Sequence, residues 1–168
     1  MVGTGIAHAW SILESIPDPE IPVVSIRELG ILREINEIDG SLQIVITPTY
    51  SGCPAMGQIE DDIRSALAAA GMEARLLTRL APAWTTDWMT PAARDKLRAY
   101  GIAPPHTTAA AASGIVHFAT RKPGGDNVAC PRCGSGNTTE TSHFGSTACK
   151  SLHKCLDCLE PFDHFKPY

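Results

Sequence analysis

The hydrophobic positions in the first part of the chain predict one helix followed by two strands. Apolar side chains recur at helical spacing over residues 5–16, and Pro17 ends that pattern. Residues 30–38 and 41–48 are rich in isoleucine, and the two segments meet at the dipeptide Asp39-Gly40. Because this dipeptide favours a tight two-residue turn, we expect the segments to form a hairpin.

The next elements are predicted to be a helix, a strand and a second, shorter helix. Apolar residues repeat at helical spacing from near Pro54 up to Gly71, which is a natural C-terminal stop. Residues 74–81 alternate like a strand, and residues 91–100 read as a short helix. We therefore expect an α+β domain over residues 1–103, with helices packed on a small mixed three-stranded sheet.

The remaining third of the chain has a different pattern. Residues 103–113 carry no charge and little periodicity, so we interpret residues 104–127 as a linker. Within that linker, residues 115–120 are a candidate edge strand. Residues 128–168 hold closely spaced cysteines and are expected to form a separate small ribbon.

Charge and composition exclude several classes of partner. A net charge of -4 argues against nucleic acid, because phosphate backbones are held by clustered lysine and arginine. The chain has no long apolar run and no basic region followed by an apolar stretch, so we expect neither a membrane span nor a secretory signal. We expect a cytoplasmic protein. In that compartment, six cysteines indicate metal or redox chemistry rather than disulfides.

Four of the cysteines form two CxxC pairs, Cys130 with Cys133 and Cys155 with Cys158. Two intervening residues let a tight turn direct both sulfurs at one ion, and two such turns supply a closed tetrahedral site. The spacing predicts one structural metal ion, preferably zinc, because a small ribbon gains its stability from metal binding. The alternatives are a single iron in the same cage, which would make the ribbon an electron carrier, and a redox dithiol pair.

Three residues near these pairs are candidates for other roles. Cys149 is interpreted as a buried small residue, a spare ligand or a reactive thiol. His143 and His153 are alternative metal ligands, although four cysteines already complete a tetrahedral site.

Cys53 is the candidate functional thiol of the first domain. It precedes Pro54, and proline is favoured at the first helical position, so Cys53 is expected at or next to the N-cap of a helix. The helix dipole would favour the thiolate there, which lowers the pKa and makes the sulfur a better nucleophile and soft-metal ligand. The alternative is a small residue that fills a strand-to-helix turn.

A proline-rich loop carries two acids that are candidates to hold a cation or a basic group of a partner. Asp18 and Glu20 are two residues apart, which places both carboxylates on one side of an extended segment. The alternative is a solvated turn in which Asp18 caps a backbone amide. Further along, Trp84 and Trp88 are four residues apart and either pack in the core or line a groove.

Several catalytic motifs are missing from the sequence. It contains no GxSxG, HExxH, Walker or GxGxxG motif, and no histidine stands out as the partner of a nucleophile. The chain is therefore not expected to be an enzyme on its own.

Three segments carry a family resemblance. They are DPEIP at residues 18–22, TPTYSGCP at 47–54, and FGSTACK at 144–150 with EPF following at 160–162. With them, the chain resembles over essentially its whole length the PaaD family, the D subunits of phenylacetyl-CoA epoxidase systems. Its first part is similar to the SufT-like iron-sulfur assembly domain, in which the cysteine matching Cys53 is the functional thiol.

The resemblance implies a role in aerobic phenylacetate degradation, beside an oxygenase with a di-iron centre and an iron-sulfur flavin reductase. Because no di-iron or flavin site is evident in the sequence, we expect a maturation or assembly factor. In this hypothesis Cys53 transiently holds iron or an iron-sulfur cluster, assisted by Asp18, Glu20 or Cys149, and the zinc ribbon docks the client.

Two other functions remain open at this point. One is an electron-transfer component with iron in the ribbon, and the other is a purely structural adaptor stabilised by zinc. The expected partners are the reductase or the oxygenase subunits, and the sequence leaves open whether the chain also pairs with itself as a homodimer.

Overall fold

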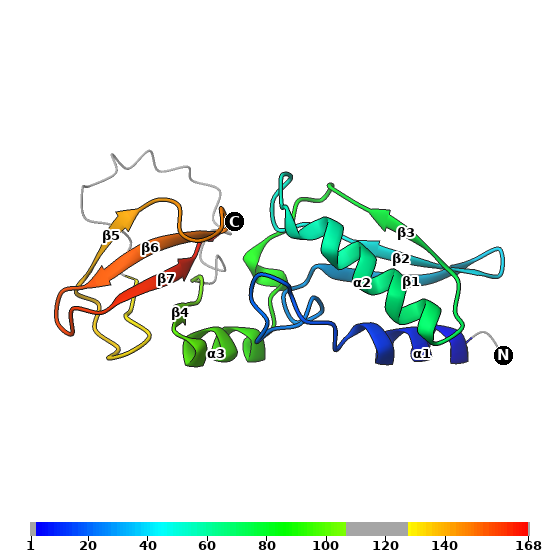
Figure 1. The fold of residues 1–168 in the computed structure, drawn as a ribbon, viewed down its shortest axis with the longest axis horizontal. Helices are drawn as coiled ribbons and strands as arrows, with labels where there is room; N and C mark the ends of the chain where they lie inside the picture. The colour runs from blue at the N-terminus through cyan, green and yellow to red at the C-terminus, as the bar shows by residue number, and fades with distance from the viewer. Residues whose placement is uncertain (1–2, 107–127, 168) are drawn as a thin grey trace, which may run out of the picture. The chain divides into compact units, whose positions relative to one another are not determined.

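The computed structural model describes residues 3–106 and 128–167, which fall into two compact units, Met1–Ala93 and Arg94–Tyr168. Each unit contains its own sheet, as Figure 1 shows. The candidate edge strand at residues 115–120 lies outside the described residues. None of the helices in the described part of the chain combines the length and the hydrophobicity that crossing a membrane requires.

The first unit is built on a three-stranded sheet in the order β1-β2-β3. β1 (Leu32–Ile38) pairs antiparallel with β2 (Ser41–Ile46), which in turn pairs parallel with β3 (Ala74–Thr78). Asp39 and Gly40 join β1 to β2 with φ angles of 51° and 78°, which is the conformation that a tight hairpin turn requires. The predicted α+β class with a mixed three-stranded sheet is confirmed.

Two helices pack with this sheet. α1 (Gly3–Leu13) contacts α2 (Ala55–Ala69), and each of them also contacts the sheet (Figure 1). α2 ends before Gly71, whose φ of 67° suits a glycine at the end of a helix. Its buried face repeats at helical spacing through Ile59, Ile63 and Leu67.

The long connection between α1 and β1 also contributes to the core. The helix predicted over residues 5–16 ends at Leu13, and the chain then folds back on itself, with Pro17 and Ser25 forming an antiparallel bridge. The apolar side chains of this connection are at most 1% exposed at Ile21, Val24, Ile26 and Leu29. These residues have no helical or strand periodicity, so the pattern did not identify them as core.

The second unit contains a four-stranded sheet in the order β4-β7-β6-β5. Its three longer strands, β5 (Thr138–Ser142), β6 (Lys150–Cys155) and β7 (Pro161–Phe165), are antiparallel. A small apolar cluster lies in this unit and consists of Ala103, Val128, Cys130, Cys155 and Phe162. Two of the candidate metal ligands are thus part of its core.

The boundary between the units differs from the one predicted at residue 103. The chain divides between Ala93 and Arg94, inside the first turn of α3 (Pro91–Tyr100). The reason is β4 (Ile102–Ala103), which pairs parallel with β7 of the ribbon. This pairing joins segments about 60 residues apart, which local patterns do not reveal.

Candidate metal centre and thiol site

The first cysteine pair lies in a tight turn ahead of β5. The amide of Gly134 donates to the carbonyl of Cys130 at 2.9 Å, and the amide of Cys130 donates to the carbonyl of Ser135 at 2.8 Å. Gly134 has a φ of 77°, which a residue with a Cβ rarely adopts. The turn places the Cys130 side chain in the interior and leaves Cys133 exposed.

The second pair follows the same design. Cys155 ends β6, and its amide donates to the carbonyl of Glu160 at 3.0 Å. The backbone amide of Cys158 donates a hydrogen bond to the Cys155 sulfur at 3.5 Å. This backbone amide lowers the pKa of the Cys155 thiol to about 7, because it stabilises the thiolate.

The four sulfur atoms lie within 4.8 Å of one another. The Cys130 and Cys158 sulfurs are 3.8 Å apart, and those of Cys133 and Cys155 are 3.6 Å apart. A tetrahedral ion with metal–sulfur bonds of about 2.3 Å separates its ligands by about 3.8 Å. The spacing therefore fits one metal ion held by all four predicted cysteines.

Asp157 connects the two turns. Its carboxylate accepts a short hydrogen bond from the hydroxyl of Ser135 and a second bond, of 2.7 Å, from the side-chain amide of Asn137. These donors lower the pKa of Asp157, so the carboxylate stays ionised. The second CxxC turn is thus tied to the first by side chains as well as by the metal site.

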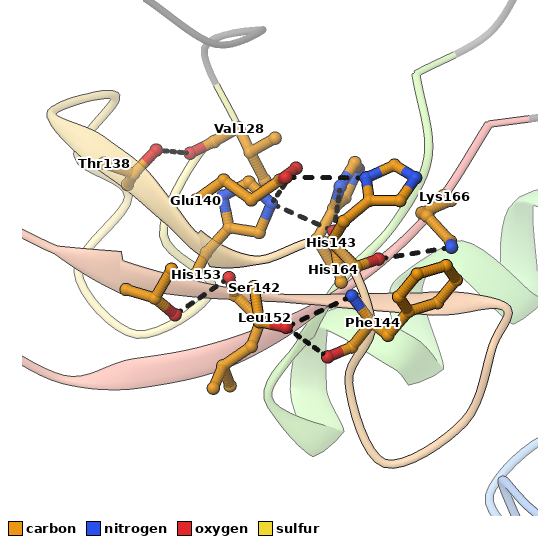
Figure 2. A network of polar contacts seen from close by, with 12 residues as sticks. Val128, Thr138, Glu140, Ser142, His143, Phe144, Leu152, His153, His164 and Lys166 are labelled. Carbon is orange, nitrogen blue, oxygen red and sulfur yellow. Dashed lines mark hydrogen bonds and ion pairs between the residues drawn. The ribbon is translucent and has the colours of Figure 1, made fainter.

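The two histidines that were alternative ligands lie in another network. Figure 2 shows His143 and His153 on either side of Glu140, with their nitrogens 3.5 Å and 3.8 Å from its two carboxylate oxygens. His153 is buried against the ring of Phe162, and burial lowers its pKa although Glu140 acts against this shift. Neither histidine belongs to the four-cysteine group.

Cys149 is likewise separate from the four-cysteine group. It lies just before β6, is 3% exposed, and has its sulfur 3.0 Å from the hydroxyl of Thr147. This environment matches the interpretation of a small buried residue. A part for Cys149 in cluster transfer stays a prediction.

Cys53 lies in the turn between β2 and α2, directly before Pro54 at the N-cap of the helix. Its thiol is half-buried. Burial raises the pKa of Cys53, the charges of Glu20 and Asp18 raise it further, and hydrogen bonds from the Ala55 amide and the Thr49 side chain offset only part of this. The predicted lowering of the pKa is therefore wrong, because desolvation and two carboxylates outweigh the helix terminus.

The acidic loop is ordered by Asp18. One carboxylate oxygen of this buried residue accepts the amides of Glu20 at 2.9 Å and of Ile21 at 2.8 Å, so Asp18 caps the turn. Both Asp18 and Glu20 lie close enough to act on the Cys53 thiol. The structure thus brings together three of the four residues predicted for iron transfer, whereas Cys149 belongs to the other unit.

Thr49 is a further neighbour of the thiol, and the sequence pattern alone does not mark it as one. It is 8% exposed, and its side chain hydrogen-bonds the Cys53 sulfur. The only sequence signal is its position four residues before the cysteine in the TPTYSGCP segment.

Comparisons with known proteins match a different family to each of the two units. Residues 7–74 match the model of iron-sulfur cluster assembly proteins, and residues 117–166 match that of the PaaD zinc beta ribbon domain. The putative D subunit of the 1,2-phenylacetyl-CoA epoxidase of Escherichia coli (strain K12) is 48% identical over 162 residues, covering 96% of this chain and 92% of the relative.

Among solved structures, a domain of unknown function, DUF59, from Bacillus anthracis resembles this chain. The two are 26% identical with a TM-score of 0.50, over 55% of this chain and 90% of that one. This likeness supports the α+β fold.

Proposed function

Because the chain belongs to the PaaD family of phenylacetyl-CoA epoxidase subunits, we propose that it is a non-catalytic accessory subunit that matures or assembles a metal centre of such an epoxidase system. The observation that carries this proposal is the pairing of two unlike sulfur sites in one chain. One is a closed group of four cysteines, and the other is a lone half-buried thiol beside two carboxylates.

The ribbon would hold a structural zinc ion through Cys130, Cys133, Cys155 and Cys158. Four thiolates leave no open position for a substrate, and zinc would supply a redox-silent link between the two turns. The ribbon is thereby kept rigid enough to dock a client component.

The first unit would receive iron or an iron-sulfur cluster as cargo at Cys53. Its raised pKa keeps the thiol protonated when no cation is near. An arriving cation is attracted by the charges of Asp18 and Glu20, and the thiol then releases its proton to solvent and binds as thiolate. A single sulfur ligand suits transient binding, because it leaves the other coordination positions of the iron free for ligands from the client.

The client would be the iron-sulfur flavin reductase or an oxygenase subunit of the same system, and the work would take place in the cytoplasm during aerobic phenylacetate degradation. Supporting this choice, the relative from Escherichia coli is named as a subunit of the epoxidase.

The test compares wild type, Cys53→Ser and Cys149→Ser, purified without oxygen and reconstituted with iron and sulfide. We expect one zinc per chain in all three proteins, and iron and sulfide in wild type but not in Cys53→Ser. The Cys149→Ser protein shows whether the buried thiol takes part. If wild type takes up no iron, cluster carrying fails and a zinc-stabilised adaptor becomes the better account.

The electron-transfer alternative has its own signature. The four-sulfur geometry accepts iron as well as zinc. Iron in the ribbon would give the purified protein a visible thiolate-to-iron absorption band that Cys53→Ser retains and Cys155→Ser loses.

A further inference from the structure

A groove on the first unit, far in sequence from Cys53, carries chemistry that the proposed function does not use. It has a volume of about 610 Å³, and its lining includes Trp10, Glu14, Arg27, Gly30, Arg33 and Trp88. Two tryptophans and two arginines in one groove are unusual for a surface of solvated side chains, because both residue types concentrate at binding sites.

The groove is preformed by close backbone packing. Gly30 has a φ of 76°, and a Cβ at this position would lie 2.7 Å from the carbonyl oxygen of Trp88. Trp88 ends the short 3-10 helix η1 (Thr86–Trp88), and the amide of Thr90 beyond it donates to the carbonyl of Glu28 at 2.9 Å. Trp84 is buried and donates to the carbonyl of Leu29, so it anchors the segment while Trp88 faces the groove.

Arg33 is a cation without an ion-pair counterpart among the described residues. Its guanidinium lies 3.5 Å from the centroid of the Trp88 ring, and no hydrogen bond or ion pair joins it to another described residue. The neighbouring acid, Glu34, is committed to Arg79 through bonds of 2.7 Å and 3.4 Å. Burial lowers the pKa of Arg33, the neighbouring charge of Glu34 opposes this shift, and the charge of Arg79 adds to it.

Arg27 repeats the arrangement with Trp10, the second tryptophan of the lining. Its guanidinium lies 4.3 Å from the Trp10 ring centroid, and its Nε is 3.8 Å from the Glu14 carboxylate. This ion pair is long and exposed, so it contributes little. The groove therefore presents two oriented guanidinium groups against one acid.

We propose that this groove is a docking site for a partner subunit of the epoxidase system that inserts a carboxylate side chain against the guanidinium of Arg33. A stacked guanidinium offers its N–H groups in the plane that a carboxylate fills with two parallel bonds. A net excess of one positive charge matches a single aspartate or glutamate better than a polyanion such as a nucleotide. The inference rests on the proposed function only in requiring that such a partner exists.

The test measures binding of the purified oxygenase and reductase components, each immobilised in turn, to the full chain. The variants are Arg33→Gln and Arg33→Glu, and the matched control is Arg75→Glu, which changes an exposed arginine of β3 in the same unit. We expect wild type and Arg75→Glu to bind one component equally, Arg33→Gln about 10-fold more weakly and Arg33→Glu about 100-fold more weakly. Thermal melting shows that each variant is folded.

Several results would overturn the docking site. They are equal binding by Arg33→Glu and wild type, no binding of wild type to any component, or saturable quenching of tryptophan fluorescence by coenzyme A that Arg33→Gln abolishes. The last result would make the groove a small-anion site. Iron and sulfide uptake by Arg33→Gln separates this question from the proposed function, because uptake depends on Cys53 and not on the groove.

Discussion

The four-cysteine ribbon and the Cys53 region use sulfur in opposite ways. In the ribbon, four sulfurs converge within 4.8 Å, and backbone amides point at them or fix their turns. At Cys53, a single half-buried sulfur meets two carboxylates that oppose its ionisation. A convergent set of thiolates suits an ion that stays, whereas a lone protonated thiol suits one that arrives and leaves.

The largest effect is expected when one of the four ribbon ligands is removed. Cys155→Ser should lose the metal ion and the order of β5, β6 and β7, because metal binding contributes on the order of 10 kcal/mol to the folding of such small domains. Metal content and hydrogen exchange of the two units measure the effect. Cys149→Ser is the control and should keep both the metal ion and the order of the three strands. Persistence of the strands in metal-free Cys155→Ser would show that the ribbon folds without its ion.

The next effect concerns the acidic loop of the first unit. Asp18→Ala leaves two backbone amides without their acceptor and should cost about 3 kcal/mol of unfolding free energy. Urea unfolding measures it, and Asp18→Asn should lose less because the amide oxygen still accepts. Zinc content should not change in either variant. An Asp18→Ala protein as stable as wild type would mean that the loop is not held by this side chain.

A smaller effect is expected at the link between the two cysteine turns. Asp157→Ala removes the acceptor shared by Ser135 and Asn137, and should weaken metal affinity about 10-fold, as is usual for residues behind the ligands. Competition with a chelator measures this. Glu160→Ala is the comparison, because the second turn uses the Glu160 backbone carbonyl and not its side chain. Equal metal affinities in the two variants would mean that backbone hydrogen bonds alone hold the two turns, without a contribution from the Asp157 side chain.

The smallest effect is on the reactivity of Cys53. Glu20→Gln removes a negative charge that raises the pKa of the thiol, so the pKa falls and the thiolate fraction at a fixed pH below it rises. Alkylation of the Cys53 peptide at pH 8, followed by mass spectrometry, should be roughly threefold faster than in wild type. Glu73→Gln, an exposed acid that does not act on this thiol, should leave the rate unchanged. Slower alkylation of Cys53 in Glu20→Gln than in wild type would mean that the Glu20 charge does not raise the pKa of this thiol.

The sequence by itself determined the elements and residues that depend on local spacing. The turn at Asp39-Gly40, the stop at Gly71 and the two CxxC turns follow from which residues tolerate positive φ or bring two sulfurs to one point. These features need only a few neighbouring residues, so a pattern reveals them.

Only the tertiary structure decided the rest, because it depends on contacts between distant segments. The pairing of β4 with β7 moves the domain boundary, and burial of the Cys53 thiol, together with the approach of Glu20 and Asp18, reverses the expected pKa shift there. The stacking of Arg33 on Trp88 joins residues 55 positions apart. Desolvation and charge act through space, so their balance at a site is fixed only when the chain has folded.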